Sequence, residues 1–278
     1  MTTSSSTYLL GHDEQELARL EHQARILAPA TRTILGLAGV APGMRVLDLG
    51  TGAGDVAFEV AALVGPTGSV VGVDQSVRAL RFAAVRAEQR GLTNVSFIHD
   101  DLHTVRIEDE FDAVVGRLIL LYTPDPAAIL RRLVRFVRPG GIVVMMEYEM
   151  HAAGTLPRTE LCTRVIGWIT EAFDRSGLDA SLGARLGPIL RDASFDEHTV
   201  IGLQAYHEPG DPAGPKLAAE TVRTLLPVIE RTGVATAGEV DIDTLEDRVA
   251  RDGARHGVTF KPPVLVGAWA VAGQEAGR

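Results

Sequence analysis

Short apolar strands alternate with helical segments over the first half of the chain, and this alternation restricts the fold more than any other feature. Runs rich in Val, Ile and Leu predict strands, and longer segments of helical period separate them. Strands joined by helices form right-handed βαβ units, whose parallel sheet is covered on both faces. The sequence therefore predicts an α/β fold with a doubly wound, seven-stranded, mostly parallel sheet. The predicted strands are 45–49, 69–74, 94–99, 111–116, 142–147, 197–206 and 264–272.

Two helices are predicted before the sheet. Apolar residues recur every three or four positions up to Leu27, and a second helix is expected at about 30–38. We expect residues 1–40 to form an N-terminal helical lid, and residues 41–278 to form the main domain. A lid of this kind gates access to a site and contributes little to the core.

Further helices are predicted in the second half of the chain. A long helix at 158–176 and a shorter one at 183–192 follow the fifth strand. Helices at 217–231 and 242–256 lie between the last two predicted strands. We therefore expect a helical cap that is inserted into the main domain at about 208–256.

Charge, cysteine content and hydropathy exclude several classes of protein. The 27 Lys and Arg residues are outnumbered by 36 Asp and Glu, and the formal net charge of −9 opposes binding to a phosphate backbone. No apolar run reaches the ~18 residues that a membrane helix needs. Cys162 is the only cysteine, and Met1–Thr7 lacks the basic-then-apolar order of a signal peptide. We expect a cytoplasmic protein that acts on a small molecule and binds neither nucleic acid nor membrane, with a homodimer left open.

The first predicted strand runs into a glycine-rich loop, 50–54, and a helix follows. Glycines let the backbone approach a ligand closely, and the helix N-terminus offers free N–H groups. Two classes of nucleotide cofactor compete for such a loop. Residues 52–57 fit the dinucleotide-binding pattern G-x-G-x-x-G/A, and Asp74 lies 20 residues beyond Gly54, where a ribose-binding acid is expected.

Acidic residues around the loop favour a cationic ligand over a dinucleotide. Asp48 and Asp55 flank the loop, and their charges would oppose a bound pyrophosphate. A ligand with an ammonium and a sulfonium would gain from the same carboxylates. A second acidic site, Asp100-Asp101-Leu102, follows the third strand, where a carboxylate and a backbone N–H could bind the edge of an adenine ring.

Five motifs follow one another at predicted strand ends and loops. They are Val46-Leu47-Asp48-Leu49-Gly50-Thr51-Gly52-Ala53-Gly54, Val73-Asp74-Gln75-Ser76, His99-Asp100-Asp101-Leu102, Phe111-Asp112-Ala113-Val114-Val115 and Arg138-Pro139-Gly140-Gly141. In this order and spacing, the sequence resembles the class I S-adenosylmethionine-dependent methyltransferases over about 43–150. The strand at 262–272 resembles the final antiparallel strand of that family. The start, Tyr8-Leu9-Leu10-Gly11, resembles a bacterial subgroup that acts on small molecules, including secondary metabolites.

The resemblance implies a Rossmann-like methyltransferase domain at 41–278, S-adenosylmethionine as cofactor, and a set of cofactor-binding residues. Asp74 would accept hydrogen bonds from both ribose hydroxyls, and Asp101 with the Leu102 amide would bind the adenine edge. Arg117 would lie near the methionyl carboxylate, and Tyr8 would close over the cofactor. The other expected cofactor-binding residues are Asp48, Gly50, Thr51, Gly52, Gly54, Gln75 and Asp100.

Glu147, Glu149 and His151 alternate at the end of the fifth predicted strand, so their side chains share a direction. Ligands of open α/β sheets bind beyond the carboxyl ends of the strands. We therefore predict Glu147 and His151 as catalytic residues, with a base role for one of them. The alternative is that Glu149 and His151 are solvated loop residues.

His99 and His103 flank the acidic site in a pattern that resembles a metal cluster. The adenine ring is expected at the same place, so we predict no metal site. The sequence thus predicts methyl transfer from S-adenosylmethionine to the oxygen or carbon of a small, hydrophobic or aromatic organic acceptor. Two alternatives stay open: a related protein that uses the cofactor site for a non-methylating rearrangement, and an NAD-dependent oxidoreductase.

Overall fold

The computed structural model describes residues 14–273 except residue 109. The chain forms two compact units, and each is described by itself. Of the described residues, the sheet unit contains 23–147 without residue 109, 183–203 and 265–273. The helical unit contains 14–22, 148–182 and 204–264.

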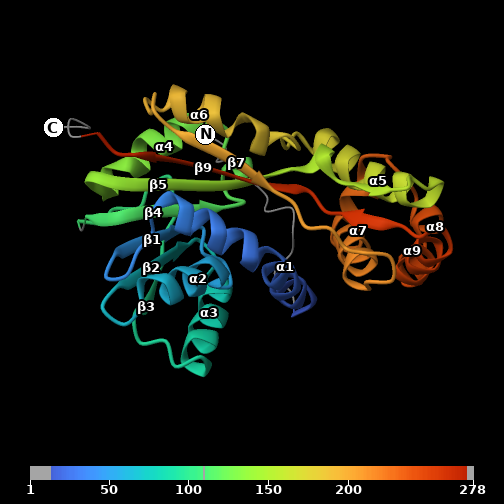
Figure 1. Cartoon of the computed structure of the whole chain (residues 1–278), viewed down its shortest axis with the longest axis horizontal. Coiled ribbons are helices and arrows are strands. Elements are labelled where there is room, and N and C mark those ends of the chain that lie inside the picture. The colour runs from blue at the N-terminus through green and yellow to red at the C-terminus, as the bar shows by residue number, and fades with distance from the viewer. Residues whose placement is uncertain (1–13, 109, 274–278) are drawn as a thin grey trace. The chain divides into compact units, whose positions relative to one another are not determined.

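The sheet unit contains a seven-stranded sheet in the order β3-β2-β1-β4-β5-β9-β7 (Figure 1). Strands β1 to β5 pair in parallel, and β7 pairs antiparallel with β9. The backbone of Ala272 bonds to Gly140 and Gly141, so the end of β9 meets the beginning of β5 and runs antiparallel to it. The predicted α/β fold is confirmed. The strands are β1 (Arg45–Leu49), β2 (Ser69–Asp74), β3 (Val95–His99), β4 (Phe111–Arg117), β5 (Val137–Glu149), β7 (Thr199–Leu203) and β9 (Val264–Val271).

Local signals in the sequence explain where the helices of the sheet unit begin. The Ser76 side chain accepts a hydrogen bond from the Ala79 N–H at the start of α3, and Asp125 accepts one from the Ala128 N–H at the start of α4. Pro126 occupies the first turn of α4, where its missing N–H costs nothing. The elements are α2 (Asp55–Val64), α3 (Val77–Gln89), α4 (Pro126–Leu133), α6 (Leu186–Asp192) and three short 3₁₀ turns, Leu120–Tyr122, Val134–Phe136 and Leu182–Arg185.

The first helix, α1 (Glu14–Ala38), is continuous, although the sequence predicted two helices. Pro29 lies inside it. A proline removes one helical hydrogen bond, but α1 continues through it. From Leu27 onward, the apolar face of α1 is buried, and a Cβ built at Gly267 of β9 would lie 2.4 Å from Ile34 Cγ2. This half of the expected lid is therefore part of the core of the sheet unit, while Tyr8 lies outside the described residues.

The helical unit combines the segment after β5 with the segment between β7 and β9. The expected cap at 208–256 is therefore larger than predicted, because residues 148–182 belong to the same unit. A small antiparallel sheet of β6 and β8, with Thr155 opposite Phe260, was not predicted. The elements are α5 (Glu160–Ser176), α7 (Ala213–Arg231), α8 (Ala237–Val240), α9 (Ile242–His256), β6 (Gly154–Leu156), β8 (Thr259–Lys261) and the turn Met150–Ala152.

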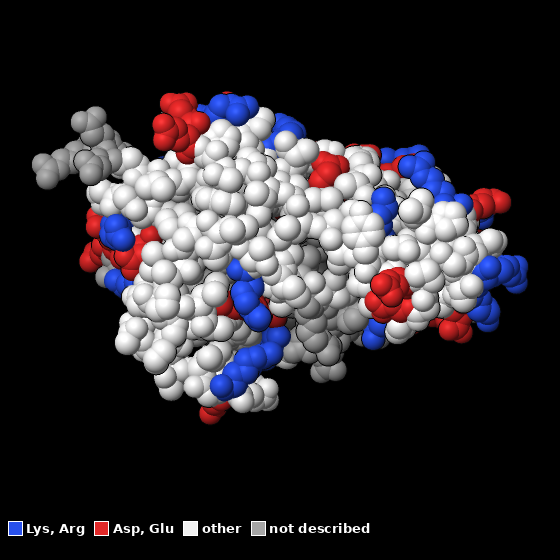
Figure 2. All heavy atoms as spheres, in the orientation of Figure 1, with Lys and Arg blue, Asp and Glu red and all other residues white. Residues whose placement is uncertain are grey.

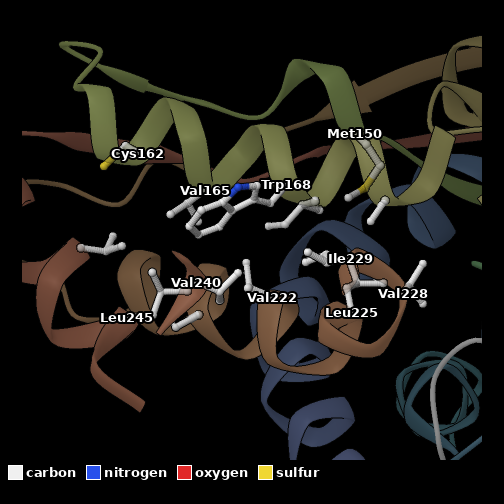
Figure 3. Packing of buried hydrophobic residues seen from close by; sticks show 14 of the residues in the cluster. Met150, Cys162, Val165, Trp168, Val222, Leu225, Val228, Ile229, Val240 and Leu245 are labelled. Carbon is white, nitrogen blue, oxygen red and sulfur yellow. The ribbon is translucent and has the colours of Figure 1, made fainter. Parts of the chain in front are cut away.

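The helical unit has its own hydrophobic core, seen in Figure 3 between α5 and the helices that face it. Trp168 on α5 is 7% exposed and points into this core beside Val165. Phe173 packs against the same cluster while half-buried. Both aromatic side chains therefore contribute to the packing of the helical unit.

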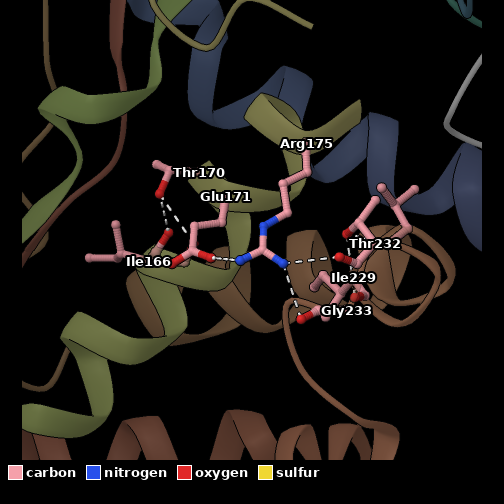
Figure 4. Close-up of polar contacts among 9 residues, drawn as sticks. Ile166, Thr170, Glu171, Arg175, Ile229, Thr232 and Gly233 are labelled. Carbon is pink, nitrogen blue, oxygen red and sulfur yellow. Dashed lines mark hydrogen bonds and ion pairs between the residues drawn. The ribbon is translucent and has the colours of Figure 1, made fainter. Parts of the chain in front are cut away.

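The Arg175 side chain connects the C-terminal end of α5 to the C-terminal end of α7 through hydrogen bonds (Figure 4). Its Nη1 donates to the carbonyls of Thr232 and Gly233 at 3.0 and 3.1 Å, and its Nη2 donates to Glu171 Oε2 at 3.0 Å. The last carbonyls of a helix have no partner within the helix, so a cation there supplies both hydrogen bonds and charge complementarity.

Acidic and basic side chains are interspersed over the visible face of the molecule (Figure 2). In the part of the chain that the structure describes, no helix is both long and apolar enough to cross a membrane.

Gly267→Ala should lower the free energy of unfolding by about 1–3 kcal/mol, because the new methyl group would overlap Ile34 in a packed core. Urea unfolding measures this loss. The matched control is Gly36→Ala on α1, where an added Cβ has no neighbour within 4 Å. That change should be neutral or stabilising by up to about 1 kcal/mol. Equal midpoints for Gly267→Ala and wild type would contradict the close packing of α1 on β9.

Candidate functional site

The glycine-rich loop between β1 and α2 requires glycine for two different reasons. Gly50, Gly52 and Gly54 all have positive φ angles, of 61°, 53° and 86°. A Cβ at Gly50 would lie 2.4 Å from Ile119 Cγ2, and one at Gly54 would lie 2.6 Å from the Phe58 ring. At Gly52 the nearest atom to such a Cβ is 3.9 Å away, so this part of the loop backbone is open to a ligand.

Asp48, at the end of β1, is 1% exposed. Its Oδ2 accepts a hydrogen bond from the Thr51 hydroxyl at 2.6 Å, and its Oδ1 has no partner among the described residues. Burial raises the pKa of Asp48 to about 7, against the lowering effects of the Thr51 hydroxyl and the Arg117 charge, and Asp74 raises it further. A buried carboxyl with one unused oxygen is an acceptor that a ligand can satisfy.

Asp74, at the end of β2, is held by two backbone donors. The Gly52 N–H donates to Oδ2 at 2.9 Å, and the Ser76 N–H donates to Oδ1 at 2.8 Å. A carboxylate has about four acceptor positions, so two positions stay available. The half-buried carboxylate is thus oriented beside the loop, with one free position on each oxygen.

The segment after β3 lies beside Asp74, because the Asp100 N–H donates to the Asp74 carbonyl at 3.2 Å. Asp100 Oδ1 accepts from the Asp101 N–H, and Asp101 Oδ1 accepts from the His103 N–H, both at 2.8 Å. The Leu102 N–H donates no hydrogen bond among the described residues. The structure therefore brings Gly52, Asp74 and the Asp100–Leu102 segment together, as the sequence predicted.

The residues beside this segment are less enclosed. Gln75 is exposed, and its carbonyl lies 3.0 Å from His99 Nε2. His103 is also exposed. Among the described residues, no group of three or more His, Cys, Asp or Glu side chains is arranged to hold a metal ion.

Arg117, at the end of β4, is half-buried and lies on the strand next to β1, where Leu49 pairs with Gly116. Its Nη1 donates to the Thr31 hydroxyl of α1 at 2.9 Å, and its charge lowers the pKa of Asp48. The Thr31 contact could not be predicted from the sequence, because the two residues are 86 positions apart.

Glu147 is 1% exposed, although the sequence predicted a base that faces an acceptor. Its Oε1 accepts two backbone hydrogen bonds, from the Ile119 N–H at 2.9 Å and from the Leu120 N–H at 2.7 Å. Burial raises the pKa of Glu147 to about 8, and these two donors only partly offset it. This pKa favours the protonated carboxyl at neutral pH. The buried position of Glu147 also differs from that of a proton acceptor that faces solvent.

His151, the other predicted catalytic residue, belongs to the helical unit and not to the sheet unit of Glu147. It is exposed, and its Nε2 lies 3.8 Å from Asp174 Oδ1. Glu149 Oε1 accepts from the His151 N–H at 3.1 Å and from the Ser181 hydroxyl at 3.3 Å. A base role for His151 stays a prediction.

Arg86 on α3 is part of the loop structure, and the sequence analysis missed it. Its Nη2 lies 2.7 Å from Asp55 Oδ1, and its Nη1 donates to the Ala53 carbonyl at 2.6 Å. The guanidinium also lies over the rings of Phe58 and Phe82. Because Arg86 neutralises Asp55, the electrostatic argument against a pyrophosphate depends on Asp48. A lone arginine on the apolar face of α3 was the signal that could have revealed it.

The described groups fit the cofactor that the sequence resemblance implies. The unused acceptor positions of Asp48 and Asp74 match hydroxyl or ammonium donors, the open backbone at Gly52 allows close approach, and the Leu102 N–H is a donor for an adenine nitrogen.

The raised pKa of Asp48 predicts a pH-dependent stability. Its folded-state pKa of about 7 lies above the reference value of 3.8, so the folded state binds this proton more tightly. The free energy of unfolding therefore falls as the pH rises through the window between the reference pKa of 3.8 and the folded-state pKa of about 7. In Asp48→Asn this side chain cannot ionise. Between pH 5 and pH 8 the free energy of unfolding of the variant should therefore fall by about 1–3 kcal/mol less than that of the wild type, since one pKa unit corresponds to about 1.4 kcal/mol.

Chemical unfolding at the two pH values measures the difference. Asp112→Asn is the control: burial raises the pKa of Asp112, but the Arg45 N–H and Arg138 lower it more, so this carboxyl titrates below the window. Equal losses for Asp48→Asn and wild type would show that Asp48 is already ionised at pH 5.

Comparisons with known proteins agree with the fold and with the cofactor that the sequence resemblance implies. A family model described as a methyltransferase domain matches residues 41–171. The arsenite methyltransferase of Aquipseudomonas alcaligenes is 39% identical over 107 residues, which cover 36% of this chain and 31% of that enzyme. The nocamycin O-methyltransferase of Saccharothrix syringae is 37% identical over 114 residues, which cover 41% of each chain. The chain thus spans less than half the length of these curated relatives.

A solved structure shows the same fold over a larger part of the chain. The crystal structure of a SAM-dependent methyltransferase from Aquifex aeolicus superposes with a TM-score of 0.51 at 20% identity, and covers 71% of this chain and 93% of that one. Together with the strand order and the glycine-rich loop, these matches show that residues 41–171 are similar to a methyltransferase domain and that the chain has the fold of a solved S-adenosylmethionine-dependent methyltransferase.

Proposed function

We propose that this protein transfers a methyl group from S-adenosylmethionine to a small organic acceptor. The observation that carries the proposal is the acid-lined loop, in which Asp74 is oriented by the Gly52 N–H and Asp48 keeps one oxygen unsatisfied. When bound, S-adenosylmethionine supplies a methyl group that its sulfonium has already activated. The protein is then left to bind, to orient and to exclude water.

Different residues of the sheet unit would bind different parts of the cofactor. Asp74 would bind the ribose hydroxyls, and Asp101 with the Leu102 N–H would bind adenine beside Gln75. Asp48 and the glycines of the loop would lie along the ribose and the methionine part. The Arg117 guanidinium would pair with the methionyl carboxylate while Thr31 fixes one of its nitrogens.

The acceptor is proposed to be hydrophobic or aromatic and to be methylated on oxygen or carbon. The nocamycin O-methyltransferase, which is 37% identical over 114 residues, supports an oxygen of an organic compound as the acceptor. An oxygen acceptor must lose a proton, so a base would contribute, and His151 is the exposed candidate that we propose for this role.

Asp74→Ala should weaken the binding of S-adenosylhomocysteine about 10- to 150-fold, because charge-assisted hydrogen bonds to the ribose contribute about 1.5–3 kcal/mol. Isothermal titration calorimetry measures the affinity, and NADH is titrated in parallel. Asp112→Ala is a matched control at the start of β4, since this carboxylate also accepts a backbone N–H, from Arg45, and lies away from the loop. Tight binding of NADH but not of S-adenosylhomocysteine would overturn the proposed function.

His151→Ala should reduce turnover at least about 100-fold if His151 is the base, and should leave the affinity for S-adenosylhomocysteine unchanged. Transfer of a radiolabelled methyl group across a panel of phenols, hydroxy acids and enols measures turnover. His256→Ala is the matched control, because this histidine is also an exposed residue of the helical unit. Wild-type turnover in His151→Ala would show that His151 is not the base. Consumption of an acceptor without methylation would instead favour a rearrangement.

A further inference from the structure

The Ile119 side chain packs so closely against the glycine-rich loop that position 50 has no room for any residue larger than glycine. A Cβ at Gly50 would lie 2.4 Å from Ile119 Cγ2, and one at Gly116 would lie 2.8 Å from Ile119 Cδ1. The side chain is buried and fills the space between the loop and the end of β4. The position of Ile119 therefore fixes how far Gly50 can move.

The turn that carries Ile119 is conformationally strained. Leu118, the residue before it, has a φ of +57°, in the left-handed region that side-chain-bearing residues rarely adopt. Such a conformation persists only where surrounding contacts hold it. The contacts come from β5: the Leu118 N–H donates to the Met146 carbonyl at 2.8 Å, and the next two N–H groups donate to Glu147 Oε1.

We propose that Glu147 is a positioning residue for cofactor binding: its Oε1 holds the Ile119–Leu120 backbone, and through it the Ile119 side chain, against Gly50. The proposal rests on the proposed function, because it concerns the same cofactor loop. Glu147 binds no substrate in this role. It keeps the loop in the shape in which the Gly52 N–H reaches Asp74.

The chemistry of the carboxyl supports this role. One oxygen, Oε1, accepts both N–H groups, and the burial of the side chain raises the pKa of Glu147 to about 8, which favours the neutral form of the carboxyl. A glutamine side chain has the same shape, an acceptor oxygen and a donor group in place of the protonated oxygen. Glu147→Gln should therefore preserve the turn, whereas Glu147→Leu leaves two buried N–H groups without a partner.

The test compares S-adenosylhomocysteine affinity at pH 7 by calorimetry in wild type, Glu147→Gln and Glu147→Leu. We expect Glu147→Gln to bind within about 3-fold of wild type and Glu147→Leu to bind at least about 10-fold more weakly. Hydrogen exchange at the Ile119 and Leu120 amides should be fast in Glu147→Leu and slow in Glu147→Gln. Gly267→Ala controls for a general loss of stability, because the three atoms nearest to its new Cβ all belong to Ile34 and none to the loop.

Two conservative changes at Ile119 test the same contact if Glu147→Leu does not fold. Ile119→Val keeps the Cγ2 methyl that faces Gly50, and Ile119→Leu keeps the carbon count but removes that methyl. We expect near wild-type affinity for the first and at least about 5-fold weaker binding for the second. Wild-type affinity in both Glu147→Leu and Ile119→Leu would overturn the proposal, as would equally weak binding in Gly267→Ala. Failure of the wild type to bind would instead contradict the proposed function.

Discussion

The glycine-rich loop is packed between two hydrophobic side chains, Ile119 on one side and Phe58 on the other, and the rest of the site depends on this packing. Neither Gly50 nor Gly54 could carry a Cβ without displacing one of them. Because both ends of the loop are held in this way, the backbone between them is fixed, and the Gly52 N–H is directed at Asp74. A parallel sheet makes this arrangement possible, since the turn that carries Ile119 follows β4 and the helix that carries Phe58 follows β1, and both strands end at the same edge.

Two carboxyl groups, Asp48 and Glu147, are buried at that edge, and the fold compensates their burial differently. Asp48 is partly stabilised by the Thr51 hydroxyl and by the Arg117 charge, and it retains an unsatisfied oxygen. Glu147 has both of its donors from the backbone. A group with an unsatisfied acceptor is suited to binding a ligand, whereas a group with its acceptor oxygen fully used is suited to holding structure. Asp55 differs from both, because Arg86 neutralises it.

Much of the fold could be predicted from the sequence, because the central strands are buried on both faces and therefore appear as unbroken apolar runs. The acids at the carboxyl edge could also be located, since each lies at the end of a predicted strand or just after it, and their binding of a cofactor stays a prediction. The contacts of Arg86 and Ile119 could not be predicted, because their partners Ala53 and Gly50 lie 33 and 69 positions away along the chain. The continuity of α1 through Pro29 was missed for a related reason: its tertiary contacts, such as that of Ile34 with β9, outweigh the local preference for a break.

Glu147 shows why position at the end of a strand does not by itself assign a catalytic role. The pattern of an acid after an apolar strand is the same for Asp48, Asp74 and Glu147, and it predicts only that the side chain lies at the carboxyl edge of the sheet. What separates the three is the part of the fold that each carboxyl binds. Asp48 accepts the Thr51 hydroxyl of the loop, Asp74 accepts the Gly52 and Ser76 N–H groups, and Glu147 Oε1 accepts two N–H groups of a strained turn. A carboxyl that stabilises a strained backbone next to a binding loop can influence binding as strongly as one that contacts the ligand, because the loop's shape depends on it.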